Sequence, residues 1–185
     1  MSDKFFTDYF KFIQVGLEAA DHNDLIAAAG KIQEISKKGN KLIIAGNGGS
    51  AAIASHVSVD FTKAAGVRAI NFNEADLLTC FSNDYGYEYV YEKAVEFYGD
   101  NEDMVILISS SGNSANVVNA ARRAKELNMG VITFSGFGSN NPLRKLGDIN
   151  FWIDSKAYNI VEMTHHIWLL AIVDYIIGDV EYSSS

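Results

Sequence analysis

The chain has 185 residues, which suits one domain, and its 48% hydrophobic and 21% charged residues are typical of a globular protein with a core of ordinary size. The formal net charge of −8 argues against nucleic acid or an acidic membrane surface as a partner, because both attract clustered Lys and Arg. The single cysteine, Cys80, excludes an internal disulfide and a cysteine-based zinc site, and we interpret it as a small buried residue.

The N-terminal part of the chain is predicted to be helical. Aromatic and aliphatic side chains recur at helical spacing from Phe5 to Leu17, and a second helix is predicted over Leu25–Ser36, with Gly39 suited to its end. The aromatic stripe Phe5–Phe10 indicates core or a subunit interface. We treat residues 1–185 as one domain, with 1–38 as an N-terminal helical extension and 39–180 as the α/β core and C-terminal helix.

Beyond residue 39, short apolar runs alternate with helical segments. The runs carry apolar, often β-branched residues at consecutive positions, which is typical of strands buried on both faces of a parallel sheet. They are Lys41–Ala45, Val67–Phe72, Met104–Ile108, Gly130–Phe134 and Ile149–Ile153. The helical segments lie near Ser50–Ala64, Tyr87–Phe97, Ser114–Leu127 and Asn159–Ile177. This alternation predicts an α/β fold: a three-layer, doubly wound, flavodoxin-like five-stranded parallel sheet, whose ligands bind beyond the carboxyl ends of the strands.

Two serine-containing turns follow the first and third predicted strands. Residues 46–50 read Gly-Asn-Gly-Gly-Ser, where glycines allow positive φ and close approach of a ligand. Residues 109–114 read Ser-Ser-Ser-Gly-Asn-Ser and open a helix, whose N-terminus favours an anion. Either turn alone could be a strand-to-helix turn with helix capping. Their joint position at one edge of the sheet favours a phosphate site.

A dinucleotide-binding interpretation competes with this one. Residues 46–51 fit the loose fingerprint G-x-G-x-x-A, which calls for an acidic residue at the end of the second strand to hold a ribose. The sequence offers Asn71, Asn73 and Glu74 there, and the interpretation leaves the second serine turn unexplained. No G-x-x-x-x-G-K-[ST] is present, so a P-loop is excluded.

Taken together, residues 46–50 and 108–117 resemble the SIS (sugar isomerase) domain, and most closely its phosphoheptose isomerase branch. The segment Asn83–Tyr87 is similar to that branch's Asn-Asp-aromatic-Gly-aromatic segment, and the likeness covers nearly the whole chain. It implies a sugar-phosphate ligand and a homotetramer with sites shared between subunits. With the other polar residues of the turns, the phosphate-binding candidates are Asn47, Gly48, Ser50, Ser109, Ser110, Ser111, Asn113 and Ser114, with Asp84 near the substrate.

The resemblance also implies a zinc site, but two of its positions are changed. In that branch the ligands are a His and a Glu four residues apart on the helix after the first turn, and a Gln and a His on the last helix. His56 matches the first ligand and Asp60 takes the Glu position, whereas Val161 and Leu169 stand at the other two. Zinc needs three or four good donors, so we expect the family's site not to be intact. Zinc at His56 is left open, and no cofactor is assigned.

Acid–base residues lie close to the changed positions. An aldose–ketose isomerisation needs a base that moves a proton between adjacent carbons and an acid that serves the oxygens. The candidates are Asp60 or Glu162 as base and His165 or His166 as acid partner, and the resemblance places a Glu at the Glu162 position. The alternative is structural: His56 and Asp60 would form a helix or subunit contact, and the other three would be polar interface groups.

Three functions follow from these observations. The first is a phosphosugar isomerase related to phosphoheptose isomerase, with an altered centre. The second is a non-catalytic sugar-phosphate-binding or regulatory protein, similar to a bacterial branch of the family that associates with the replication initiator. The third is a nucleotide-binding oxidoreductase. The first ten residues lack a secretory-signal pattern, and no apolar run approaches the ~20 residues of a membrane span, so we expect a cytoplasmic protein with no membrane partner.

Overall fold

A five-stranded parallel sheet forms the centre of the computed structural model, which describes residues 3–182. The strands are β1 (Leu42–Gly46), β2 (Ala69–Asn71), β3 (Met104–Ser109), β4 (Gly130–Ser135) and β5 (Ile149–Trp152). Their order is β2-β1-β3-β4-β5, and each neighbouring pair is parallel. The chain therefore winds outward from the centre in both directions, and the direction reverses between β1 and β3. Such a switch point is where open α/β sheets bind ligands.

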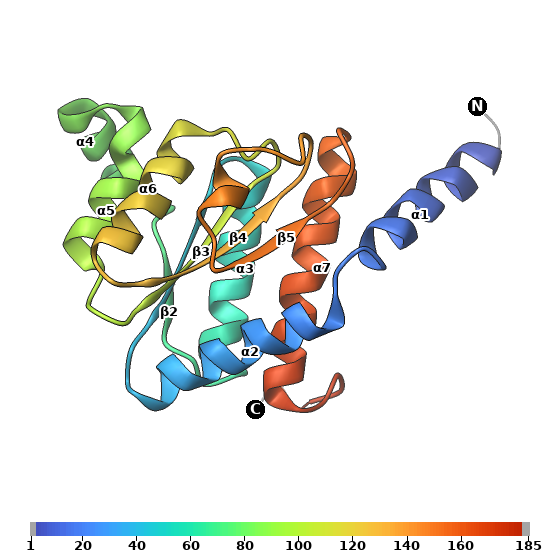
Figure 1. Cartoon of the computed structure of the whole chain (residues 1–185), viewed down its shortest axis with the longest axis horizontal. Helices are drawn as coiled ribbons and strands as arrows, with labels where there is room; N and C mark the ends of the chain where they lie inside the picture. Colours follow the sequence, from blue (N-terminus) through green and yellow to red (C-terminus); the bar gives the residue numbers. More distant parts are fainter. Residues whose placement is uncertain (1–2, 183–185) are drawn as a thin grey trace.

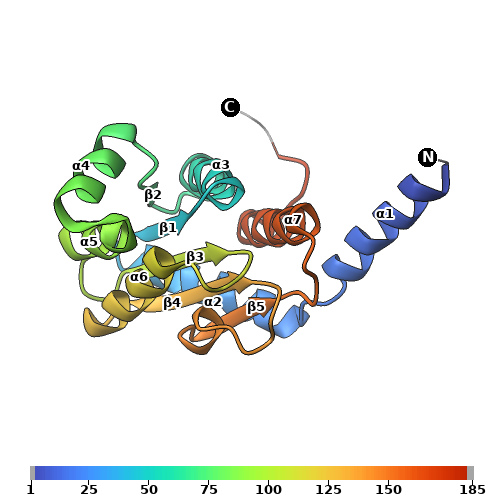
Figure 2. The same ribbon diagram turned by 90° about the horizontal axis from the view of Figure 1, so that it is seen from above.

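Helices cover both faces of the sheet, which gives the three predicted layers (Figure 2). One face carries α2 (His22–Lys37), α3 (Gly49–Lys63) and α7 (Tyr158–Ile177), and the other carries α5 (Val90–Tyr98) and α6 (Ala115–Glu126). The remaining helices are α1 (Asp3–Leu17), α4 (Ala75–Tyr85) and two short 3₁₀ turns, η1 (Tyr87–Tyr89) and η2 (Leu143–Lys145). The predicted fold class is confirmed.

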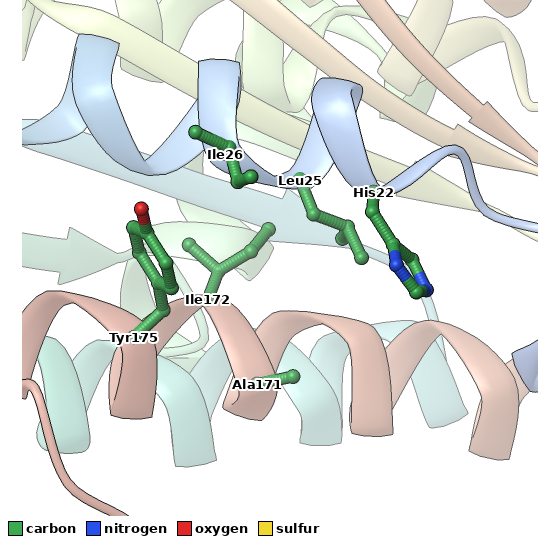
Figure 3. A pocket seen from close by; sticks show the side chains of 6 residues that line it. All are labelled: His22, Leu25, Ile26, Ala171, Ile172 and Tyr175. Atoms are coloured by element: carbon green, nitrogen blue, oxygen red, sulfur yellow. The ribbon is translucent and has the colours of Figure 1, made fainter.

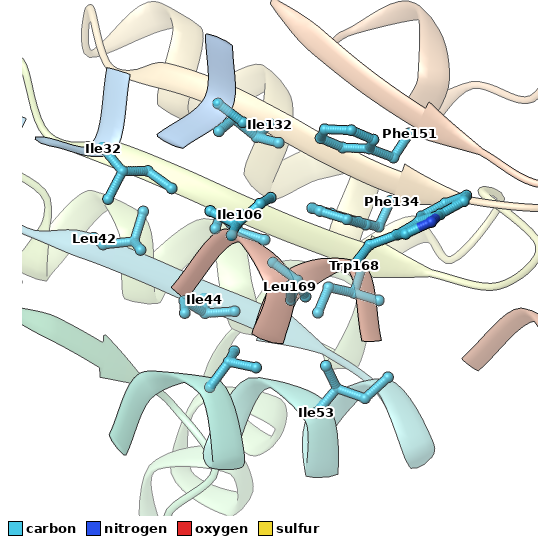
Figure 4. Close-up of a cluster of buried hydrophobic side chains, with 14 of the residues drawn as sticks. Ile32, Leu42, Ile44, Ile53, Ile106, Ile132, Phe134, Phe151, Trp168 and Leu169 are labelled. Atoms are coloured by element: carbon cyan, nitrogen blue, oxygen red, sulfur yellow. The ribbon is translucent and has the colours of Figure 1, made fainter. Parts of the chain in front are cut away.

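The core is split by the sheet into two clusters because side chains alternate along each strand. Ile44 and Ile106 belong to the cluster under α2, α3 and α7, which Figure 4 shows. Ile43 and Val105 belong to the other cluster, under α5 and α6. β1 and β3 are buried along their whole length, so they hold the turns at their carboxyl ends on a rigid frame.

α1 extends away from the rest of the fold in both views (Figures 1 and 2). Its last turn contacts α7, where the Trp168 indole N–H donates to the Leu17 carbonyl at 3.0 Å. Gly16 permits this contact, since a Cβ there would lie 2.7 Å from the Thr164 hydroxyl. The outward part of α1 exposes large apolar side chains: Phe5, Phe6, Phe10, Phe12 and Val15.

α7 is 20 residues long and, by length and composition alone, apolar enough to cross a membrane. The expectation that no stretch approaches a membrane span is therefore wrong on this measure. The core helix of a soluble protein passes the same test, and α7 packs against α1, α2, α3 and β4. Some of its apolar side chains, such as Trp168 and Leu169, are buried in the core, whereas others, such as Ile167 and Tyr175, are exposed.

Two local predictions differ from the structure. The helix predicted over Tyr87–Phe97 is divided into η1 and α5, and α4 precedes it without having been predicted. α4 has no fully buried residue, so its apolar periodicity is a poor signal of a helix. The expectation that Cys80 is buried is also wrong, because this residue is exposed on α4.

Candidate functional site

The first turn joins β1 to α3 at the switch point. A Cβ on Gly46 would lie 2.8 Å from the Ile108 carbonyl of β3 and 2.6 Å from the Ser50 Cβ, so only glycine fits between these elements. Gly48 precedes α3 with φ +55°, a conformation that favours glycine. Ser50 lies buried in the first turn of α3, and Asn47 lies between the glycines. This turn therefore brings the N-terminus of α3 close to the end of β3.

The second turn joins β3 to α6 beside the first. Ser109 and Ser110 are buried, and the Ser109 and Ser114 hydroxyls are 3.0 Å apart and share a hydrogen bond. Ser114 is the N-cap of α6, but its side chain makes no capping bond, so the hydroxyl turns toward Ser109 instead. Gly112 supports the turn with φ +65°. The result is a group of hydroxyls in front of a helix N-terminus, where an anion is favoured.

The two turns enclose a cavity of about 120 Å³. Its lining residues are Asn47, Ser50, Ile108, Ser109, Ser110, Ser111, Ser114, Tyr158 and Glu162. This volume is below the 300–1,000 Å³ of pockets that hold a whole drug-sized ligand, so the cavity suits one small end of a ligand. No Lys or Arg is among the lining residues, so hydroxyls, amides and the N-termini of α3 and α6 would hold an anion.

Glu162 is the charged residue of this cavity and comes from α7. Its Oε1 accepts a long hydrogen bond of 3.5 Å from the Ser110 hydroxyl. It lies directly over Gly49, where a Cβ would be 2.3 Å from Oε2, so the glycine leaves room for the carboxylate. One carboxylate thus occupies the space between the serine turns. It is loosely held, which suits a group that moves a proton or gives way to a ligand.

The other predicted acid–base residues do not line the cavity. His165 is fully buried, and its Nε2 bonds the Ser135 carbonyl at 3.0 Å. Burial lowers the pKa of His165 to about 4, although the bond to Ser135 acts in the opposite direction. His165 therefore packs as a neutral core residue beside Phe134 and Trp168.

His56, Asp60 and His166 form a hydrogen-bonded group between α3 and α7, which we call the histidine–aspartate cluster. His166 Nε2 and His56 Nδ1 are 2.8 Å apart, and His56 Nε2 is 3.2 Å from Asp60 Oδ2. Burial and the neighbouring His56 lower the pKa of His166, against the opposite effect of Asp60. His166 follows Glu162 by one helical turn, so the cluster lies next along α7 from the cavity.

The residues at the implied zinc positions do not fit a zinc ion. Val161 and Leu169 are fully buried in the core cluster under α3 and α7, and both nitrogens of His56 are engaged by His166 and Asp60. Among the described residues, no group of three or more His, Cys, Asp or Glu is arranged to hold a metal. The apolar side chains of Val161 and Leu169 supply no donor atom to a metal.

Three further predicted residues, Gly48, Asn113 and Asp84, lie outside the cavity lining. Asp84 is exposed on α4, where it accepts from the Asn83 side chain at 2.9 Å. Asn113 bonds back to Ser111 within its own turn, through its backbone N–H and its side chain. From the segment that contains Asp84, it is Tyr87 that reaches the first turn, donating its hydroxyl to Asn47 Oδ1 at 2.9 Å.

Four residues that shape the site were not among the predicted site residues: Gly49, Tyr87, Asn116 and Tyr158. The first three lie in the quoted turns and family segments, but no role was assigned to them. Tyr158 opens α7 and lines the cavity, and Asn116 bonds Asn47 across the two turns. Asn116 lies in the stretch used for the family resemblance, so its type was visible but its partner was not. These roles depend on contacts between segments distant in the chain.

A separate apolar pocket of about 270 Å³ lies between α2 and α7 (Figure 3). It is lined by His22, Leu25 and Ile26 from α2 and by Ala171, Ile172 and Tyr175 from α7. Tyr175 follows Glu162 by thirteen residues, which is about 20 Å along a helix, so this pocket is remote from the serine turns.

Comparison with known proteins agrees with this fold. Residues 6–136 match the model of the SIS domain family, so the chain belongs to the SIS domain family. Within it, the chain is similar to proteins named phosphoheptose isomerase. That of Fusobacterium nucleatum is 36% identical over 170 residues, covering 89% of this chain and 85% of that protein. That of Campylobacter jejuni is 39% identical over 148 residues, covering 76% and 78%.

Solved structures show the same likeness. A phosphoheptose isomerase from Francisella tularensis superposes with a TM-score of 0.86 at 25% identity, covering 96% of this chain and 99% of that one. The phosphoheptose isomerase of Neisseria gonorrhoeae gives 0.85 at 28% identity, covering 94% and 96%. The family resemblance drawn from the serine turns is confirmed.

Proposed function

We propose that this protein is an aldose–ketose isomerase of sugar phosphates, acting on a substrate of the sedoheptulose 7-phosphate kind. The observation that carries the proposal is the presence of the Glu162 carboxylate in the cavity formed by the two serine turns. Such an arrangement combines a site for a phosphate with a group able to accept a proton. The similarity to phosphoheptose isomerases along most of the chain supports the choice of sugar.

The phosphate is placed among the hydroxyls of Ser50, Ser109, Ser111 and Ser114. The cavity holds only this end, so the sugar chain extends out of it. A seven-carbon chain with bonds of about 1.5 Å puts the reacting carbons on the order of 8 Å from the phosphate. A chain that runs between α3 and α7 passes Glu162 first and reaches the histidine–aspartate cluster one turn later.

The reaction follows from these positions. Glu162 takes a proton from the carbon next to the carbonyl, which gives an enediol, and returns it to the adjacent carbon. His166 passes a proton to the carbonyl oxygen as the enediol forms, and it takes the proton of the neighbouring hydroxyl as the enediol collapses to the other carbonyl. The phosphate is negative and displaces the Glu162 carboxylate from the serine turns, toward the reacting carbons. The role of Asp60 is to hold the His56 ring, which in turn holds His166.

A non-catalytic sugar-phosphate-binding protein is the second candidate. One observation favours it: the changes at Val161 and Leu169 remove half of the donors that the family resemblance implies. The phosphate turns would be kept for binding, and the histidine–aspartate cluster would stabilise the contact of α3 with α7. This candidate predicts sugar-phosphate binding without turnover.

Incubation of the purified protein with sedoheptulose 7-phosphate and a panel of five- to seven-carbon sugar phosphates separates the candidates. Products are followed by NMR, with added zinc and with a chelator, and binding is followed by calorimetry. We expect turnover that the chelator does not remove. Binding without turnover supports the second candidate. If the protein shows no binding and no turnover with any of these compounds, both candidates are refuted.

We also propose that the protein is a cytoplasmic homotetramer with sites shared between subunits. The apolar side chains exposed on α1 support assembly, because a surface of this kind is typical of an interface. The small cavity supports shared sites, since the sugar end would need walls that one chain does not provide. Light scattering measures the assembly, and a Phe6→Glu, Phe10→Glu variant should reduce it.

A further inference from the structure

The side chains of Asn47 and Asn116 pair with each other across the two turns. Asn47 Nδ2 donates to Asn116 Oδ1 at 2.9 Å, and Asn116 Nδ2 donates to Asn47 Oδ1 at 2.9 Å. Asn47 belongs to the turn after β1, and Asn116 is the second residue of α6, where it is 2% exposed. This reciprocal pair therefore ties the first turn to the helix that begins at the second.

The orientation of both amides is fixed by a backbone group. The Val117 N–H donates to Asn116 Oδ1 at 3.0 Å, and an N–H cannot accept a hydrogen bond. The oxygen of Asn116 must therefore face Val117, and Asn47 must face that oxygen with its NH₂ group. The oxygen of Asn47 then lies on the other side, where it accepts from Asn116 and from the Tyr87 hydroxyl at 2.9 Å.

This network determines what Asn47 can offer to a ligand. Its oxygen already accepts two hydrogen bonds, whereas its NH₂ group has two hydrogens and uses one of them for Asn116. Asn47 lines the cavity between the serine turns. Its free N–H is thus available to an oxygen of a phosphate or sugar, and the carbonyl oxygen that would repel an anion is turned to internal donors.

We propose that Asn116 is a positioning residue that, together with Tyr87, holds Asn47 as a hydrogen-bond donor toward the ligand and keeps the two turns at a fixed separation. The inference rests on the proposed function, because it assumes that the cavity binds a phosphate. Tyr87 adds a link to the segment between α4 and α5, so that the position of this segment depends on the same amide. Asn116 itself does not line the cavity.

The test is calorimetric titration with inorganic phosphate and with sedoheptulose 7-phosphate, on the wild type and on Asn116→Ala, Asn47→Ala and the double variant. We expect Asn116→Ala to weaken binding about tenfold, as the loss of one or two hydrogen bonds predicts. Because the pair acts as a unit, the double variant should bind no more weakly than Asn47→Ala alone. Tyr87→Phe, at an exposed site, should weaken binding about threefold, since one of the two donors to Asn47 remains.

Asn119→Ala is the matched control. Asn119 lies one turn further along α6 and donates to the Glu88 carbonyl, so it also ties α6 to η1 without touching Asn47. The affinity of the Asn119→Ala variant for both ligands should stay within twofold of the wild type. Each variant is measured below its own melting temperature.

Three results would overturn the inference while leaving the proposed function intact: unchanged affinity of Asn116→Ala, additive losses in the double variant, or an equal loss in Asn119→Ala. If Asn116→Ala does not fold, the comparison of Tyr87→Phe with Asn119→Ala decides, and equal affinities of these two overturn it. A wild type that binds neither ligand refutes the proposed function itself.

Discussion

The exchange Glu162→Gln separates the two roles that we propose for the cavity between the serine turns. The carboxylate shares this space with the proposed phosphate site, and Gln has nearly the same shape without the charge. A carboxylate whose only role was to bind the substrate would increase affinity. A carboxylate that acts as a base is needed for turnover, and its charge lowers the affinity of the cavity for an anion. We therefore expect Glu162→Gln to bind phosphate more tightly and to lose activity.

The size of the effect on binding follows from the dimensions of the cavity. A sphere of 120 Å³ is about 6 Å across, and unit charges at that distance repel by about 0.7 kcal/mol in water and about 3 kcal/mol at an effective dielectric constant of 20. Removal of the charge should therefore tighten phosphate binding about 3-fold to 100-fold. Turnover should fall about 10²-fold to 10⁴-fold, the usual contribution of a general base.

Calorimetry with inorganic phosphate measures the first effect, and an NMR assay with sedoheptulose 7-phosphate measures the second. The gain in affinity should shrink at high salt, because a cavity open to solvent is screened. Asp179→Asn, which removes one charge beyond the far end of α7, should change neither quantity. Unchanged or weaker phosphate binding by Glu162→Gln would refute the placement of the carboxylate beside the phosphate, and full turnover would refute its role as base.

Three further predictions follow. Gly49→Ala puts a Cβ 2.3 Å from Glu162 Oε2, so it should displace the carboxylate and lower turnover at least tenfold with little change in melting temperature, as NMR and calorimetry would show. Leu169→His places a polar ring in the core and should lower the free energy of unfolding by about 1–3 kcal/mol in urea titrations, without creating a zinc site. Burial raises the pKa of Asp103, but bonds from Lys41 and Asp100 outweigh it and leave this pKa lowered, so its stabilising effect should be full above about pH 4 and be lost as the pH falls further.

Each of these has an outcome that would contradict it. Wild-type turnover in Gly49→Ala would mean that the carboxylate moves aside without consequence. Tighter zinc binding by Leu169→His than by the wild type would show that the metal site is restored by one donor. For Asp103, the acid-induced loss of stability should be reduced in Asp103→Asn, whereas Asp100→Asn, at an exposed partner of the same Lys41, should retain it. An undiminished loss in Asp103→Asn would contradict the role of this carboxylate.

Much of the fold could be predicted because its signals are local. Consecutive apolar residues mark β1 and β3 as strands buried on both faces, and glycine and serine directly after them mark turns that open helices. Parallel strands end at one edge, so the placement of both serine turns at that edge followed without any structure. That they lie side by side depends on the pairing of β1 with β3. α4 was missed because a helix that lies on the surface without a buried face leaves little pattern in the sequence.

The serine turns and their position at one sheet edge were thus determined by the sequence alone. Tertiary structure decided which acid–base residue meets them. Glu162, His165 and His166 lie within five positions on one helix, yet the first lines the cavity, the second is buried beside Ser135, and the third bonds His56. Successive side chains on an α-helix point in directions about 100° apart, so these three residues lie on different faces of α7. The packing of α7 against α3 and the sheet therefore decides which neighbours each side chain meets. The amide pair of Asn47 with Asn116 arises in the same way, from segments 69 residues apart that only the folded sheet brings into contact.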